Sequence, residues 1–159
     1  MSDETPTSAD ETEKERVDRE LIEFLNEVRV VLPGVQVLFA FLLTLPFMGT
    51  FDDIDGIERI AYNVAFFSTA LSAVLMITPS SFHRLRFRKG DKEEILRASS
   101  RLVLAGIVFL GVAMVAVVWL VAELVFSPAI ANAIGIVSAV IVIGLWFAFP
   151  LSRRFVEGR

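Results

Sequence analysis

Glu123 is the one ionisable side chain within four long apolar runs, at residues 31–51, 60–78, 102–126 and 129–151. An unpaired charge in such a run is costly, so an ionisable residue there is a functional candidate, as in proton-coupled transporters. Glu123 also lies only about three residues from the end of its run, where its side chain could simply reach an interface. The sequence supports both interpretations of this carboxylate.

The four apolar runs identify the class of protein. Each is near or above the ~20 residues that a helix needs to cross a membrane. The chain is 55% hydrophobic and 21% charged, with mean hydropathy +0.65, and its charges are segregated between the apolar blocks. We therefore expect an all-α integral membrane protein, a four-helix transmembrane bundle with an N-terminal amphipathic helix on the cytoplasmic side.

Several kinds of chemistry find no support in the residues. The chain has no cysteine and a single histidine, His83, so thiolate sites and multi-histidine metal sites cannot form within one chain. There is no nucleotide-binding glycine loop, no catalytic pair of carboxylates and no nucleophile–histidine arrangement. We expect a protein that is not an enzyme, with no cofactor, no metal site and no nucleic-acid partner.

Uncharged polar side chains occur in the first two apolar runs. They are Gln36, Thr44, Asn63, Ser68, Thr69 and Ser72. Each buried amide or hydroxyl needs a partner, so interhelical hydrogen bonds are the first expectation. Gln36, Thr44 and Asn63 could alternatively line a polar or ion path together with Glu123.

Two prolines should interrupt the first helical segment, because proline lacks a backbone donor. Pro33-Gly34 predicts a break between an interfacial helix and the first span, and Pro46 predicts a kink or a stop. The carbonyl groups freed near Pro46 could coordinate an ion or accompany an ordinary kink.

Small residues recur at four-residue spacing on two spans, a pattern that permits close helix approach. One stripe is Ala131, Gly135 and Ala139, continued by Gly144 and Ala148, and the other is Ala65, Thr69 and Ala73. We expect both stripes to face partner helices in a compact bundle, or in part a second copy of the chain.

The predicted organisation has four parts. They are a disordered acidic tail at 1–10, an amphipathic interfacial helix at 11–32, a membrane domain at 33–151 and a cytoplasmic tail at 152–159. The predicted spans are about 33–51, 60–79, 102–126 and 129–150. Asp91 with Glu94 resembles a capping box and extends the third helix back to about residue 91, whereas Ser127-Pro128 predicts a tight hairpin before the fourth.

Charge placement predicts the orientation. Residues 83–101 carry seven Lys or Arg against three acids, whereas the loop at 52–59 carries one Arg against four acids. Basic residues near span ends stay cytoplasmic. We expect a multi-pass protein of the cell membrane with both termini in the cytoplasm.

The cytoplasmic side offers charged contact surfaces. Ten of the nineteen acids lie in the first 27 residues, and they could face the basic segment or remain solvated. The candidate contact or lipid head-group residues are Glu27, Arg29, His83, Arg84, Arg86, Arg88 and Lys89, with anionic lipid as a partner. On the opposite side, Asp52, Asp53 and Asp55 form either a solvated acidic loop or a weak cation site.

Several stretches resemble a known family. They are residues 26–30 (NEVRV), 34–36 (GVQ), 39–47 (FAFLLTLPF), Pro79, His83-Arg84, Phe87-Arg88, Arg101-Leu102 and 104–106 (LAG). This pattern is similar to small four-span prokaryotic, largely actinobacterial membrane proteins of unknown function, some of them labelled sodium/proton antiporters. The resemblance draws interest to Glu27, Arg29, Gln36 and Pro46.

Together these observations favour an oligomeric or accessory membrane protein that acts by interaction with another copy or another membrane protein. The alternative is a small sodium/proton-type antiporter or another ion-coupled transporter with Glu123 on its path.

Overall fold

The computed structural model describes residues 13–52, 54, 56–86 and 92–148, without the side chains at 13–18, 20, 21, 24, 25, 50, 80–86, 92–97 and 147. This part of the chain is helical and contains no strand. Its four long helices are α1 (Glu13–Thr44), α2 (Gly56–Arg86), α3 (Lys92–Val125) and α4 (Pro128–Ile143). Two 3₁₀ turns, η1 (Leu45–Phe47) and η2 (Gly49–Phe51), follow α1, and a π-helical segment η3 (Gly144–Ala148) continues α4.

Four stretches of these helices are long and apolar enough to cross a membrane. They are Asn26–Phe47, Gly56–Pro79, Ala98–Val125 and Pro128–Trp146. This agrees with an all-α multi-pass membrane protein, because a helix satisfies all its backbone hydrogen bonds within one segment.

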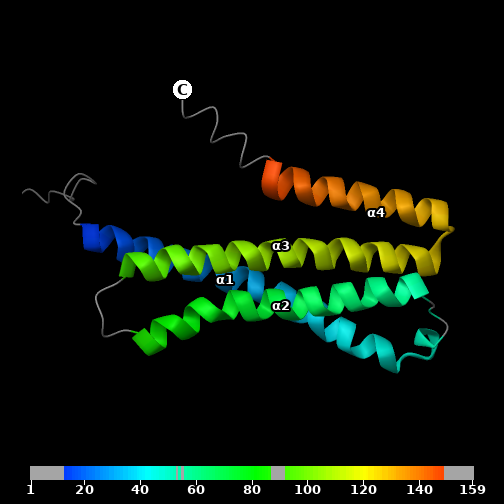
Figure 1. The fold of residues 1–159 in the computed structure, drawn as a ribbon, viewed down its shortest axis with the longest axis horizontal. Helices are drawn as coiled ribbons and strands as arrows, with labels where there is room; N and C mark the ends of the chain where they lie inside the picture. Colours follow the sequence, from blue (N-terminus) through cyan, green and yellow to red (C-terminus); the bar gives the residue numbers. More distant parts are fainter. Residues whose placement is uncertain (1–12, 53, 55, 87–91, 149–159) are drawn as a thin grey trace, which may run out of the picture.

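The helices run up and down in chain order (Figure 1). The α1–α2 and α3–α4 connections lie at one end of the molecule, which we call the Pro46 end. The α2–α3 connection and the start of α1 lie at the other end (Figure 1). Only Phe126 and Ser127 separate α3 from α4, so the predicted tight hairpin is present. Ser127 precedes Pro128 at the start of α4 but makes no side-chain capping hydrogen bond.

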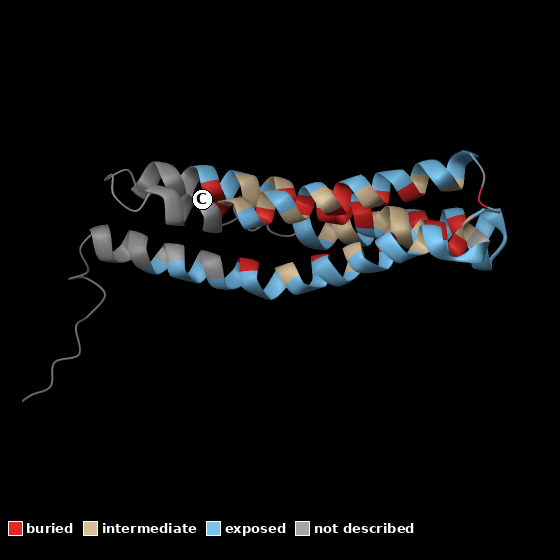
Figure 2. Cartoon of the chain, turned by 90° about the horizontal axis from the view of Figure 1, so that it is seen from below, coloured by how far each residue is buried: buried red, intermediate tan, exposed pale blue. Residues whose placement is uncertain are grey.

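The core lies between α1, α2 and α3. One cluster joins Val28 and Val35 of α1 to Met76 of α2 and Leu110 of α3. A second cluster, toward the Pro46 end, joins Leu42 to Tyr62, Ala65 and Leu120. The buried α1 positions, Val28, Val35 and Leu42, are spaced by seven residues, the repeat typical of helices packed at a small crossing angle. Figure 2 shows the rest of α1 exposed along most of its length.

The path of α1 differs from the expectation at Pro33. The helix continues from Glu13 to Thr44 with Pro33 inside it, so there is no break at Pro33-Gly34. Membrane helices tolerate an internal proline by a local adjustment, and here the ring of Pro33 lies on an exposed face. Figure 2 shows α1 bending about midway along its length. Before Pro46, by contrast, the α-helix does stop, at Thr44, and a 3₁₀ turn follows.

The four helices form an open arrangement instead of the compact bundle that we expected. Among the described residues, no Cα atom of α4 lies within 8 Å of one in α1 or α2, so α4 packs against α3 alone. Figure 1 shows α3 between α4 and α2, with α1 crossing behind α3 and α2. The small side chains Ala131 and Gly135 of α4 pack against α3. No other helix of the described residues covers the remaining faces of α4.

Candidate functional site: the polar side chains of the spans

Glu123 lies on α3, two residues before the end of the helix at Val125. The residue is partly buried, and its Oε2 atom is buried without a hydrogen-bond partner in the described part of the protein. One carboxylate oxygen is therefore enclosed by the protein, although Glu123 belongs to the last turn of the span. Its position agrees with the interfacial interpretation, and its enclosed oxygen agrees with the functional one.

The other candidates for a polar path do not converge on Glu123. Gln36 and Asn63 are exposed on α1 and α2, respectively. The hydroxyl of Thr44 donates to the carbonyl oxygen of Phe41 in its own helix, at 2.7 Å. These three side chains and Glu123 line no common cavity among those found in the described residues.

A small cavity near Glu123 is apolar. It has a volume of about 20 Å³ and is lined by Leu45, Phe51, Ile54, Leu120 and Leu124. None of these lining side chains carries a polar group, and the space is large enough for about one water molecule at most. Glu123 itself does not line this cavity, and its Oε2 atom has no hydrogen-bond partner in the described residues.

Pro46 has a specific consequence in the structure. In a continuous helix the carbonyl of Leu42 would accept from the N–H of residue 46, which proline lacks. The hydroxyl of Tyr62 on α2 donates to this carbonyl oxygen at 3.0 Å, and the bond is buried. The carbonyl near Pro46 that we considered as an ion ligand is thus already satisfied by a neighbouring helix. Phe51 packs edge-on against Tyr62, with ring centroids 4.9 Å apart.

The hydroxyl groups of α2 were expected to make interhelical hydrogen bonds. Thr69 instead donates to the carbonyl oxygen of Ala65 in its own helix, at 2.7 Å. Ser68, Thr69 and Ser72 are buried, and the helix α3 approaches them closely at Gly106. A Cβ atom at Gly106 would lie 3.3 Å from the carbonyl oxygen of Ser72. These residues therefore act mainly through their small size, which brings α2 and α3 together.

Helices α3 and α4 meet at Trp119. The indole N–H of Trp119 donates to Oδ1 of Asn132 at 2.9 Å. A Cβ atom at Gly135 would lie 2.7 Å from Cδ1 of Trp119, so only glycine fits this contact. Ala131 is also fully buried, and both residues belong to the predicted small-residue stripe. The later members differ, because Gly144 has no neighbour within 4 Å of a Cβ and Ala148 is exposed.

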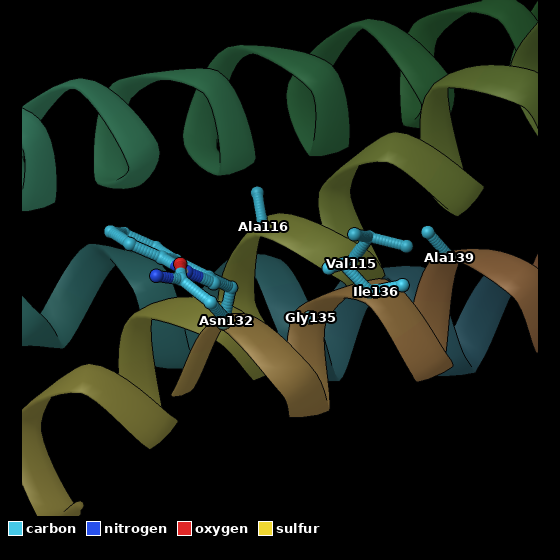
Figure 3. A pocket seen from close by; sticks show the side chains of 7 residues that line it. Val115, Ala116, Asn132, Gly135, Ile136 and Ala139 are labelled. Atoms are coloured by element: carbon cyan, nitrogen blue, oxygen red, sulfur yellow. The ribbon is translucent and has the colours of Figure 1, made fainter. Parts of the chain in front are cut away.

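A groove of about 380 Å³ lies along this junction. Figure 3 shows Val115 and Ala116 from α3 beside Asn132, Ile136 and Ala139 from α4. The groove is lined almost entirely by apolar side chains, with Asn132 as its polar exception. Across the hairpin, Trp119 of α3 contacts both Asn132 and Gly135 of α4. The tight turn at Phe126-Ser127 places these residues opposite each other. The predicted hairpin therefore implied that Trp119 lies near Asn132, although we did not predict this pair from the sequence.

The charged candidates are only partly described. Glu27 and Arg29 are exposed on α1. His83, Arg84 and Arg86 belong to the last turns of α2, at the same end of the molecule as the start of α1 (Figure 1), but their side chains lie outside the described residues. The same holds for Arg88 and Lys89 as whole residues, for the predicted cap at Asp91, and for the tails at 1–10 and 152–159.

The acidic loop at the Pro46 end is also only partly described. Asp52 is exposed, and Asp53 and Asp55 lie outside the described residues. Arg59 lies over the ring of Phe51, with its guanidinium carbon 5.9 Å from the ring centroid. Among the residues that the structure describes, no group of three or more His, Cys, Asp or Glu could hold a metal ion.

Comparison with known proteins gives one result. Neither the curated proteins nor the solved structures contain a match to this chain. The profile of a family of unknown function, DUF6328, matches residues 10–150, nearly the whole chain. This match agrees with the resemblance to an uncharacterised family. The chain belongs to the DUF6328 family.

Proposed function

We propose that this protein acts without catalysis of its own, by association within the membrane, as an oligomeric or accessory interaction protein. The observation that carries the proposal is the exposed amide of Gln36 in the middle of the α1 span. Gln36 lies ten residues after Asn26 and eleven before Phe47, the ends of that span. It is exposed and has no hydrogen-bond partner in the described part of the chain. An amide surrounded by lipid at this depth loses its hydrogen bonds, so a protein partner is favoured.

The shape of the molecule supports the same proposal. Within the apolar stretch of each span, 11% of the residues are buried in α1 and in α4, compared with 33% in α2 and 28% in α3. Exposed apolar faces are ordinary in lipid, so exposure alone decides nothing. The exposed faces of α1 and α4 nevertheless leave room for a partner helix beside either of them.

The charged segments suggest how the proposed partner contacts continue outside the membrane. The basic residues near the ends of α2 and α3 favour a cytoplasmic location for that end, and so for both termini, by the positive-inside rule. Anionic lipid head groups are the proposed partners of His83, Arg84, Arg86, Arg88 and Lys89. In this orientation the exposed Glu27 and Arg29 lie at the cytoplasmic membrane surface.

Ion-coupled transport, for example sodium/proton antiport, is the second candidate. The observation that favours it is the buried and unpartnered Oε2 atom of Glu123, because a carboxylate in a span needs a cation, a proton or a polar partner. The separation of Glu123 from Gln36, Asn63 and Thr44 argues against a continuous polar path. We therefore rank transport below association.

A flux experiment separates the two functions. The purified protein is reconstituted in liposomes with imposed sodium and proton gradients, and the internal pH is followed for wild type and Glu123→Gln. Asp52→Asn is the matched control, because it makes the same change at an exposed loop carboxylate. We expect no flux above empty liposomes in any sample. Flux in wild type and Asp52→Asn that disappears in Glu123→Gln would overturn the association proposal.

A further inference from the structure

The α1 helix carries a second heptad stripe besides the buried one. Its positions alternate in steps of four and three residues, the spacing of a helix–helix seam. They are Arg29, Pro33, Gln36, Ala40 and Leu43, which together with Phe47 of the following turn η1 we call the Gln36 seam. Every one of them is exposed, in contrast to Val28, Val35 and Leu42 on the core side.

The depth of Gln36 distinguishes this seam from an ordinary lipid-facing surface. At 1.5 Å per residue, its Cα atom lies about 15 Å along the helix from either end of the span. The flanking positions are small or apolar, with Ala40 one turn on and Leu43 45% exposed after it. The seam therefore combines close-approach and apolar positions with one amide near the middle of the candidate span.

We infer that the Gln36 seam is the interface of a homodimer, in which α1 of one copy packs in parallel against α1 of a second copy. This inference rests on the proposed function and names its partner. Copies inserted in the same orientation are related by a two-fold axis along the membrane normal, so each residue meets its twin at the same depth. A carboxamide both donates and accepts, and Gln36 can therefore bond to Gln36 of a second copy, whereas a different partner would need a polar group at this depth.

The seam also fits the geometry of two packed spans. Ala40 permits close approach next to Gln36, and Leu43 and Phe47 supply apolar contact toward the Pro46 end. Arg29 lies only three residues inside the span boundary at Asn26, so its long side chain can extend to the water layer while its stem stays in the interface. In the described residues no other helix of the same chain covers this face.

Disulfide trapping tests this inference directly, because the natural chain contains no cysteine. Single substitutions Ala40→Cys and Leu43→Cys lie on the seam and keep the Gln36 amide. Phe41→Cys, on a different face of α1, and Val137→Cys, 56% exposed on α4, are matched controls. After mild oxidation in native membrane vesicles, dimer bands on non-reducing gels should be at least several-fold stronger for the two seam variants than for the controls.

A second measurement follows the amide itself. Gln36→Leu should lower the dimer association constant by about three- to thirty-fold, whereas Gln36→Asn should retain most of it. Energy transfer between labelled copies, diluted stepwise with lipid, gives this constant. Helix content from circular dichroism checks that each variant is folded.

The outcomes distinguish this inference from the function on which it rests. Equal crosslinking at seam and control positions, adducts of a size that fits another protein, or a Gln36→Leu variant that dimerises as wild type would each overturn the α1 homodimer. An accessory role would survive these results. The accessory role is tested separately, because Glu123-dependent flux in liposomes would overturn it whether or not the chain dimerises.

Discussion

The Tyr62 hydroxyl of α2 donates to the Leu42 carbonyl oxygen of α1, the acceptor that Pro46 leaves without its helical donor. Proline thus ends one helix, and the tyrosine of the next compensates for the missing bond. Leu42 is fully buried, so no water or lipid head group would replace the tyrosine easily.

Tyr62→Phe should lower the stability of the folded protein by about 1–3 kcal/mol, because it leaves the buried carbonyl of Leu42 unsatisfied. Unfolding of the detergent-solubilised protein measures this loss. Pro46→Ala supplies the control, since it restores a backbone N–H that can bond to Leu42. In the Pro46→Ala background the cost of Tyr62→Phe should shrink, and an unchanged cost in a double-mutant cycle would contradict the proposed coupling.

Gly135→Ala should destabilise the α3–α4 hairpin by about 1–3 kcal/mol, because the added methyl group would lie 2.7 Å from Cδ1 of Trp119. Gly34→Ala is the matched control, since a Cβ at that position meets nothing within 4 Å. It should be neutral or stabilising by about 0.5–1 kcal/mol, as expected for an exposed helical glycine. Equal losses of thermal stability in both variants would show that Gly135 is not a packing site.

Asn132→Leu should lower the stability of the hairpin by about 0.5–1.5 kcal/mol through loss of the bond from the Trp119 indole. The matched variant is Trp119→Phe, which removes the donor and keeps an aromatic ring. If the two side chains act as a pair, the double variant should cost less than the sum of the single ones in unfolding experiments. Additive losses would mean that the 2.9 Å contact contributes little.

Glu123→Leu should raise the free energy of unfolding by about 1 kcal/mol or more, because it removes a carboxylate oxygen that is buried without a partner. Asp52→Asn, at an exposed position, should change stability by less than about 0.5 kcal/mol. A destabilised Glu123→Leu protein would show that the carboxylate has a stabilising partner and would contradict this prediction.

Much of the architecture could be predicted from local properties. Hydropathy along the chain located four spans, and Ser127-Pro128 located the tight hairpin, because both depend on neighbouring residues only. The hairpin also contained the pairing of Trp119 with Asn132, although the polar pair was recognised only in the structure.

The arrangement of the helices could not be predicted in the same way. The sequence predicted a break at Pro33-Gly34, a compact bundle and interhelical bonds from the serine and threonine hydroxyls of α2. The structure instead has a continuous α1, an α4 that contacts only α3, and Thr69 bonded to its own helix. A helix can bend at a proline and continue despite the missing hydrogen bond, and a threonine hydroxyl can bond within its own helix. The residue type alone therefore does not predict a helix break or an interhelical bond.

Hydropathy along the chain was enough to identify four nearly charge-free helices that are long enough to cross a membrane, since the transfer of each side chain into lipid depends on that side chain alone. Which polar groups find a partner depends on how the helices pack. The Tyr62 hydroxyl reaches the Leu42 carbonyl, Glu123 has an enclosed oxygen without a partner in the described residues, and Gln36 is exposed on α1. These outcomes depend on the rotation and spacing of whole helices, which many contacts set together.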